Sequence, residues 1–192
     1  MSHARRYMHE TVEVAMNIDY AHIDKMAQAL ADLRAFRGTL YLVGMGGSAA
    51  NCMHAASDLR KLCGLNVVCF LDNVAELTSR INDDGADSAM ADMLRNSPVG
   101  PHDALMVLSV GGGTDTVSRC LSEAVDAAKV LGIKVMGIVG RDGGHVKRHG
   151  DCVVLVPTVV PERVTPHTEA FHMVVLHCLV SHPKLQLRAT KW

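Results

Sequence analysis

The sequence lacks any marked excess of charge, because its 192 residues carry a formal net charge of −1. A nearly neutral chain gives no electrostatic reason to expect nucleic acid or an anionic membrane surface as a partner. It also lacks a recognisable signal peptide and any apolar run near the roughly 18 residues of a membrane span. We therefore expect a soluble, cytoplasmic protein with no nucleic-acid and no membrane partner.

Paired cysteines and sequence repeats are missing as well. None of the six cysteines forms a CxxC pair, and five lie inside apolar runs: Cys52, Cys69, Cys120, Cys152 and Cys178. Buried thiols in a reducing compartment explain this pattern better than disulfides or metal clusters. Apolar residues make up 48% of the chain and charged residues 20%, which is ordinary for a globular protein. This length and composition predict one domain over residues 1–192 with a full hydrophobic core.

Short apolar runs alternate with helical patterns over residues 38–192. The predicted strands cover residues 40–43, 66–71, 104–110, 134–139 and 152–156, and the predicted helices cover 48–62, 73–96, 116–131 and 168–180. The pattern within 73–96 fits one helix or two. Such alternation predicts βαβ units with right-handed crossovers, and so an α/β fold with a mostly parallel sheet between two helix layers.

Both ends of the chain lie outside this alternation. Residues 4–36 have helical spacing without proline or glycine, which predicts a long N-terminal helix within segment 1–37. A helix placed ahead of the first strand with an apolar stripe that includes Val12 and Met16 favours contact with a partner subunit. We expect the basic tail from Pro183 to Trp192 to fray.

Two glycine-rich loops with hydroxyl side chains follow the first and third predicted strands, at Gly44–Ser48 and Ser109–Thr116. In a parallel sheet both loops open at the carboxyl edge, where ligands bind. A single loop of this kind commonly does no more than make a tight turn. Two of them favour a phosphate or another anion at helix N-termini. Neither loop fits GxGxxG, and no P-loop lysine follows, so a dinucleotide or P-loop site is excluded.

Histidines and carboxylates recur on the first and last helices of the predicted core. His54 and Asp58 are four positions apart and share one helix face. His167, Glu169, His172 and His177 lie on or just before the last helix. Most helical histidines are surface or core residues, but two histidines with two carboxylates form a set that zinc accepts. The spacing alone does not establish that the two helices meet.

Two stretches resemble the sugar isomerase (SIS) family, and within it the phosphoheptose isomerases: Gly44–Leu59 (GMGGSAANCMHAASDL) and Glu169–His177 (EAFHMVVLH). The resemblance covers nearly the whole chain. It implies a five-stranded parallel sheet with flavodoxin-like strand order and a homotetramer with active sites between subunits. It also implies aldose–ketose isomerisation of a sugar phosphate, sedoheptulose 7-phosphate to D-glycero-D-manno-heptose 7-phosphate, through an enediol.

The same resemblance implies roles for individual residues. Asp58 and His177 become the acid/base pair, and zinc or another divalent metal would be held by His54, Asp58, Glu169 and His177. Phosphate and substrate contacts fall at Gly46, Gly47, Ser48, Ser109, Gly112, Thr114 and Thr116, with Asp83, Asp142 and Glu169 lining the pocket. A side chain that ligates a metal is not a free base, so the two roles compete. We favour the metal-assisted form.

Four positions depart from the family pattern. Asp58 stands for a glutamate, Glu169 for a glutamine, Gly111 for a phosphate-binding serine and Met45 for an asparagine. The two carboxylate changes favour a cation site, and Gly111 removes about one hydrogen bond to phosphate, on the order of 1–3 kcal/mol. Two alternatives therefore stay open. One is an isomerase or epimerase for a different sugar phosphate, and the other is a non-catalytic paralogue that binds a replication-initiator protein as a tetramer.

Overall fold

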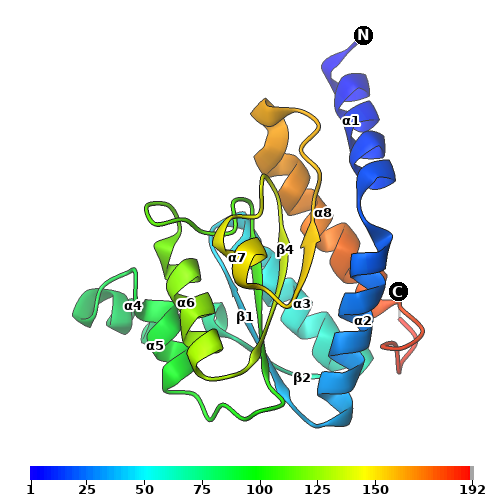
Figure 1. Ribbon diagram of the computed structural model, residues 1–192. Helices are drawn as coiled ribbons and strands as arrows, with labels where there is room; N and C mark the ends of the chain where they lie inside the picture. The colour runs from blue at the N-terminus through cyan, green and yellow to red at the C-terminus, as the bar shows by residue number, and fades with distance from the viewer. Residues whose placement is uncertain (191–192) are drawn as a thin grey trace.

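The computed structural model describes residues 1–190 and shows five parallel strands between two layers of helices (Figure 1). The strands are β1 (Thr39–Gly44), β2 (Asn66–Cys69), β3 (Ala104–Ser109), β4 (Lys134–Val139) and β5 (Cys152–Leu155). Their order in the sheet is β2-β1-β3-β4-β5, and every neighbouring pair is parallel. This confirms the predicted α/β sandwich with flavodoxin-like strand order.

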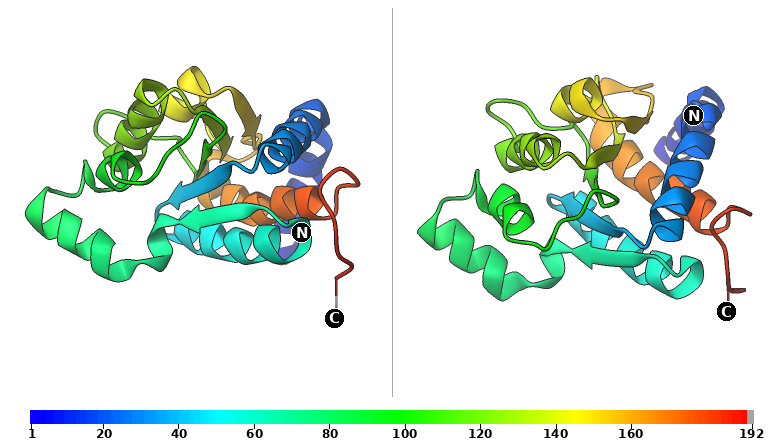
Figure 2. Two further views of the ribbon diagram at one scale, coloured as in Figure 1. Left: turned by 90° about the horizontal axis from the view of Figure 1, so that it is seen from below. Right: turned by 60° about the horizontal axis from the view of Figure 1, so that its bottom comes forward.

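Most of the helices pack on the two faces of this sheet. The helices are α1 (His3–Asn17), α2 (Tyr20–Ala35), α3 (Gly47–Cys63), α4 (Val74–Asp83), α5 (Ala89–Arg95), α6 (Arg119–Val130), α7 (Gly144–His149) and α8 (Val164–Val180), with short 3-10 turns at Phe70–Asp72 and Pro161–Arg163. One apolar cluster joins the sheet to α2, α3 and α8, and another joins it to α5, α6 and α7 (Figure 2).

Successive residues of the central strands point to opposite faces, as a period of two requires. In β1, Leu40 and Leu42 belong to the first cluster, whereas Tyr41 and Val43 belong to the second. Because both faces are covered, strands with no polar side of their own are stable here. Among residues 1–190, no helix combines the length and apolar character needed to cross a membrane.

The N-terminal segment is helical as predicted, and a break at Ile18 and Asp19 divides it into α1 and α2. Asp19 caps α2, since its Oδ1 accepts a hydrogen bond of 2.9 Å from the backbone N–H of Ala21. Figure 1 shows α1 extending beyond the sheet. The division of the chain into a helical segment 1–37 and a core 38–192 stays a prediction.

Three local predictions need correction. The short helix α7 follows the Gly140–Gly144 loop and was not predicted, since six residues give too little periodicity to detect. The last helix begins at Val164 and not near Thr168. Pro166 lies inside its first turn, where the missing N–H costs no intrahelical hydrogen bond. Cys178 is exposed, whereas the other five cysteines are buried as expected.

The C-terminal tail is held against the body over the residues that the structure describes. Arg34 donates hydrogen bonds to the carbonyls of Leu185 (2.6 Å), Lys184 (2.8 Å) and Cys63 (2.8 Å), and Leu185 is fully buried. The N–H groups of Leu187 and Arg188 also donate to the carbonyl of Leu62, so the prediction of a frayed tail is wrong as far as residue 188. Its last two residues lie outside the described part of the chain.

Candidate functional site

A cavity of about 450 Å³ opens at the carboxyl edge of the sheet. Four segments build it: the β1–α3 loop, the β3–α6 loop, the β4–α7 loop and the first turns of α8. Its lining residues are Met45, Ser48, Ser109, Val110, Gly111, Gly113, Thr114, Val117, Ser118, Arg141, Asp142, Thr165 and Glu169. The cavity therefore joins the two glycine loops that the sequence placed at one edge, together with a third loop and a helix.

The first loop presents the N-terminus of α3 to this cavity. Gly46 has a φ of 59°, a left-handed conformation that glycine adopts readily, and no side chain caps the helix. Ser48 is buried and lines the cavity. Gly47 lies directly against the carboxylate of Glu169. The helix dipole favours an anion at this end, where the carboxylate of Glu169 already lies. The N–H groups of Ser48 and Ala49 donate to the carbonyls of Met45 and Gly46.

The second loop is held in shape mainly by its own hydrogen bonds. Ser109 Oγ accepts from the N–H of Gly112 (3.0 Å), and Thr114 Oγ1 accepts from the N–H of Val117 (2.9 Å). A Cβ at Gly112 would overlap the carbonyl of Gly143, so this glycine allows the β3–α6 and β4–α7 loops to pack together. Gly112 therefore shapes the cavity, and its N–H is already engaged with Ser109.

Five of the predicted pocket residues are not in the lining of this cavity: Gly46, Gly47 and Gly112 belong to its loops, and Thr116 and Asp83 lie elsewhere. Thr116 lines a second cavity of about 260 Å³ between α4, α5 and α6. Asp83 lies at the exposed end of α4, where its carboxylate accepts hydrogen bonds from Ser79 and Asn82. Asp142 does line the main cavity, and its Oδ1 accepts from the N–H of Gly144 (3.2 Å).

The predicted acid/base pair meets on the outer surface of α3 and α8. Asp58 Oδ2 lies 3.1 Å from Nε2 of His54 and 3.7 Å from Nε2 of His177, and the two imidazole Nε2 atoms are 3.5 Å apart. Asp58 is half-buried and both histidines are exposed. The uncertainty left by the sequence is thus resolved, because the two helices do bring these side chains together.

This cluster has the chemistry of a divalent metal site. Its three ligating atoms, two imidazole nitrogens and one carboxylate oxygen, all lie within 4.8 Å of one another. Zinc accepts this donor set, and three protein ligands with an exposed fourth position are typical of catalytic zinc. The residues present therefore fit the metal.

Glu169 does not join this cluster within the chain. It lies against Gly47 in the cavity, whereas His177 is eight positions further along the same helix, about 12 Å at 1.5 Å per residue. The expected four-ligand set is therefore reduced to three. The rise of the helix keeps Glu169 and His177 of the same α8 too far apart to ligate one ion together.

Beneath the cavity, α3 and α8 are joined through buried polar groups. Asn51 donates to the carbonyl of Glu169 (2.9 Å), and its Nδ2 lies 3.5 Å from Nδ1 of His172. Burial lowers the pKa of His172 to about 4, so its imidazole is neutral near pH 7. These contacts fix the part of α8 that places Glu169 in the cavity.

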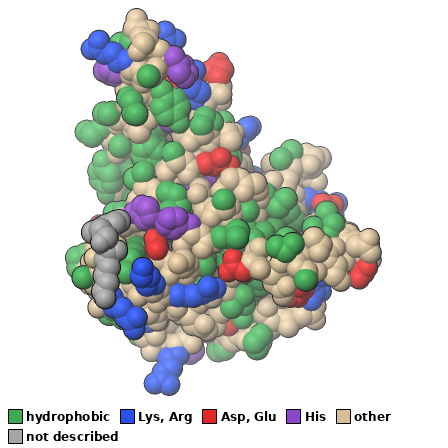
Figure 3. Space-filling model, turned by 180° about the vertical axis from the view of Figure 1, so that it is seen from behind, with side chains coloured by type: hydrophobic (Ala, Val, Ile, Leu, Met, Phe, Trp, Pro, Cys, Tyr) green, Lys and Arg blue, Asp and Glu red, His purple; other side chains and the backbone are tan. Residues whose placement is uncertain are grey.

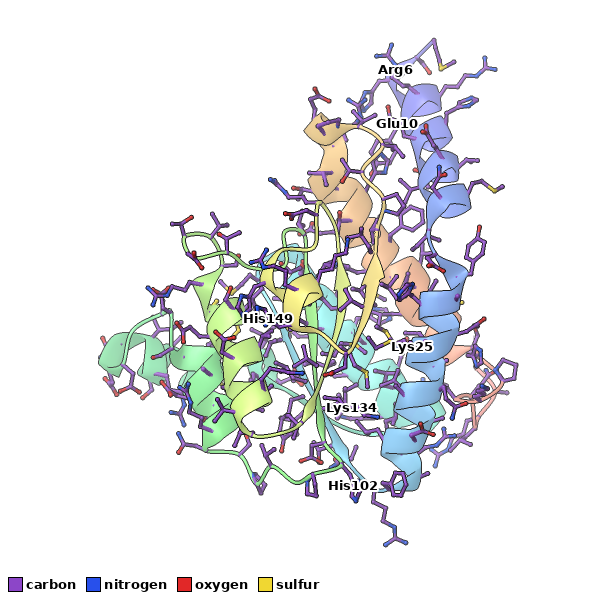
Figure 4. The ribbon with its side chains drawn as sticks, in the orientation of Figure 1. Arg6, Glu10, Lys25, His102, Lys134 and His149 are labelled. Atoms are coloured by element: carbon purple, nitrogen blue, oxygen red, sulfur yellow. The ribbon has the colours of Figure 1, made fainter. Side chains whose placement is uncertain are left out.

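A cluster that the sequence did not reveal fastens α1 to the start of α8. Arg163 donates two hydrogen bonds of 2.7 Å to the carboxylate of buried Glu10, and Nε2 of His167 donates a third at 3.1 Å. Figure 4 shows Glu10 on the side of α1 that faces α8. Hydrogen bonds from Arg163, and then from His167, lower the pKa of Glu10 to about 2. His167 thus has a structural partner rather than a place among metal ligands.

Arg141, Ser118 and Thr165 are cavity residues that sequence reasoning did not single out. Arg141 stands within the Gly140–Gly144 loop, and a cation in a loop at the carboxyl edge was the available signal. Thr165 precedes the expected start of the last helix, and Ser118 precedes α6 in a left-handed conformation with a φ of 52°. No local pattern marks these two.

Comparisons with known proteins identify the family of the chain. A profile described as SIS domain matches residues 5–140. The phosphoheptose isomerase of Helicobacter pylori (strain Shi470) is 30% identical over 150 residues, which cover 74% of this chain and 72% of that protein. That of Chlorobaculum parvum is 31% identical over 166 residues, 82% of this chain and 75% of that protein.

A solved structure of the phosphoheptose isomerase of Neisseria gonorrhoeae shares the fold. The two superpose with a TM-score of 0.79 over 92% of this chain and 95% of that chain, at 24% sequence identity. From the profile and the curated relatives, the chain belongs to the SIS domain family.

Proposed function

We propose that this protein is an aldose–ketose isomerase for a sugar phosphate, with sedoheptulose 7-phosphate and D-glycero-D-manno-heptose 7-phosphate as its substrate pair. The observation that carries the proposal is the cavity at the carboxyl edge, where hydroxyl groups and the N-terminal end of α3 converge. The names of the curated relatives support the substrate class. An edge cavity of this kind suits a phosphate held by neutral donors.

The reaction requires a base for the proton beside the carbonyl and an acid for the carbonyl oxygen. Asp58 and His177 supply these functions in our proposal, with their reactive atoms 3.7 Å apart. Asp58 lies ten positions along α3 from Ser48, about 15 Å along the helix axis. Within one chain, the acid/base pair therefore lies well beyond hydrogen-bonding distance of Ser48 in the phosphate cavity.

An active site between subunits accounts for this separation. The exposed face of α1 carries Met8, Val12 and Met16, with exposed fractions of 65%, 62% and 72%. Figure 3 shows hydrophobic side chains along this projecting helix. We propose that this face packs on partner subunits in a homotetramer, which places the acid/base pair of one subunit near the cavity of another.

In the competing form, which we favour, a divalent metal, zinc in particular, binds His54, Asp58 and His177, and Asp58 and His177 then serve as ligands and not as a free acid and base. When bound, it supplies a Lewis acid that stabilises negative charge on the substrate oxygens. Metal analysis of the purified protein and isomerase assays before and after chelation test this role. We expect activity to fall on chelation and to return with zinc; full activity in metal-free protein contradicts the metal role.

One observation favours a different sugar phosphate as a second candidate. Met45 and Ser118 line both the main cavity and the mostly apolar second cavity beside it. Met45 therefore offers an apolar wall to a sugar that is longer or less polar at one end. NMR assays of the purified protein with a panel of ketose phosphates distinguish the heptose phosphate substrate from a different sugar phosphate. Absence of turnover on every member contradicts the isomerase proposal and favours a binding protein.

A further inference from the structure

Arg141 is the sole cationic residue in the lining of the main cavity, as far as the described residues show. Two carboxylates, Asp142 and Glu169, line the same cavity. Their formal charges and that of Arg141 sum to −1, and without Arg141 the sum is −2. A phosphate that enters this cavity meets repulsion from the two carboxylates, which the positive charge of Arg141 partly offsets.

The backbone of Arg141 adopts a conformation that disfavours arginine. The N–H of Gly143 donates to the carbonyl of Gly140 (2.9 Å), which closes a tight turn with Arg141 at its second position. Its φ is 50°, in the left-handed region where glycine is usual at such a position. A residue held in this region against its preference often marks a function for its side chain.

The side chain of Arg141 covers the space beside Gly111. A Cβ at Gly111 would lie 3.8 Å from Cδ of Arg141, in ordinary van der Waals contact, and no other atom is as near. Within residues 1–190, no ion pair shorter than 4 Å engages the guanidinium, so it is available to a ligand.

We propose that Arg141 is the charge-recognition residue of the cavity and selects phosphorylated over neutral sugars. The proposal rests on the proposed function in that it assigns the phosphate group of the substrate to this cavity. A guanidinium over a glycine donates two hydrogen bonds to phosphate oxygens and replaces the hydroxyl that Gly111 cannot supply.

Binding of inorganic phosphate, measured by calorimetry, tests this inference without any need for turnover. We expect R141Q to bind phosphate about tenfold to a hundredfold more weakly than the unmodified protein, the range for loss of a charged hydrogen-bond donor. R148Q is the matched control, because Arg148 is exposed on α7 outside the cavity and its loss changes net charge equally. We expect R148Q to stay within twofold. Equal phosphate affinity in R141Q and R148Q overturns the proposal.

Two further variants separate recognition from a structural role. We expect R141G to melt at a higher temperature, by about 2–4 °C, because glycine relieves the left-handed strain, and yet to bind phosphate as weakly as R141Q. If Arg141 served only the fold, its replacement by glycine would not raise the melting temperature while it weakened phosphate binding. We expect G111S to recover part of the lost affinity in the R141Q background, since the site has room for the hydroxyl. Unchanged affinity in R141G would contradict the proposal.

Kinetics distinguish the failure of this inference from the failure of the proposed function. If the sugar phosphate is turned over, R141Q should raise its KM about tenfold or more with kcat within about threefold. Arg141-dependent phosphate binding without turnover of any sugar phosphate supports the inference and refutes the isomerase function. Turnover by R141Q with unmodified KM refutes the inference and leaves the isomerase function standing.

Discussion

Asp58 is the residue on which the proposed chemistry depends most, because its carboxylate lies between two imidazoles. We expect Asp58→Asn to lower kcat by about 100-fold or more, the range for loss of a general acid or base. Asp24→Asn is the matched control. Asp24 also lies beside a histidine, 3.4 Å from His182, but on the surface of α2. Steady-state assays check both variants, and comparable activity in the two would refute the role of Asp58.

Gly112 illustrates how one residue fixes the shape of the cavity. We expect Gly112→Ala to lower the free energy of unfolding by roughly 2–3 kcal/mol, since a Cβ there meets both a φ of 69° and the carbonyl of Gly143. Gly132 has a φ of 72° with open space around it, so Gly132→Ala costs about 1 kcal/mol. Denaturant unfolding measures both. Equal losses of unfolding free energy in the two variants would show that backbone strain alone, and not the clash with Gly143, sets the cost at Gly112.

At the scale of elements, α8 is held between α1 and α3 by polar groups that respond to acid. The depressed pKa of His172 means that the unfolded chain binds a proton more readily than the folded chain between pH 6.5 and about 4. Stability is therefore complete above pH 6.5 and declines as the pH falls toward 4. The loss is on the order of 3 kcal/mol.

Unfolding free energies measured from pH 7.5 to pH 4.5 test this dependence, with His172→Gln as the comparison. The variant cannot titrate, so we expect its stability curve to be flatter in this window. Glu10 adds a loss only below about pH 4.5, where an unfolded glutamate begins to bind its proton, and this loss continues down to its folded pKa near 2. A parallel decline in both proteins across pH 6.5–4.5 would assign the effect to other groups.

At the scale of the whole molecule, the exposed apolar face of α1 points to assembly. We expect Val12→Asp to dissociate the proposed homotetramer and to lower isomerase activity with it, because a charge on that face is buried in the assembly. Val130→Asp is the control, since Val130 is 88% exposed on α6, far along the chain from α1. Light scattering coupled to size exclusion measures the mass. A monomeric unmodified protein that is fully active would refute the shared site.

The sequence by itself determined the fold class and the local parts of the site. Alternating apolar runs specified the parallel sheet, and strand-to-helix glycines specified two loops at its carboxyl edge. Spacing of four positions placed His54 and Asp58 on one helix face. These features depend on contacts between residues near in sequence, which is why local patterns were sufficient to predict them.

Only the tertiary structure decided which distant residues share a site. It brought His177 to Asp58 and left Glu169 in the cavity, because positions on one helix are separated by its rise. It also paired Glu10 with Arg163, which lie 153 positions apart, and turned Arg141 over Gly111. Such contacts depend on how helices pack and where side chains point, and no periodicity along the chain encodes either.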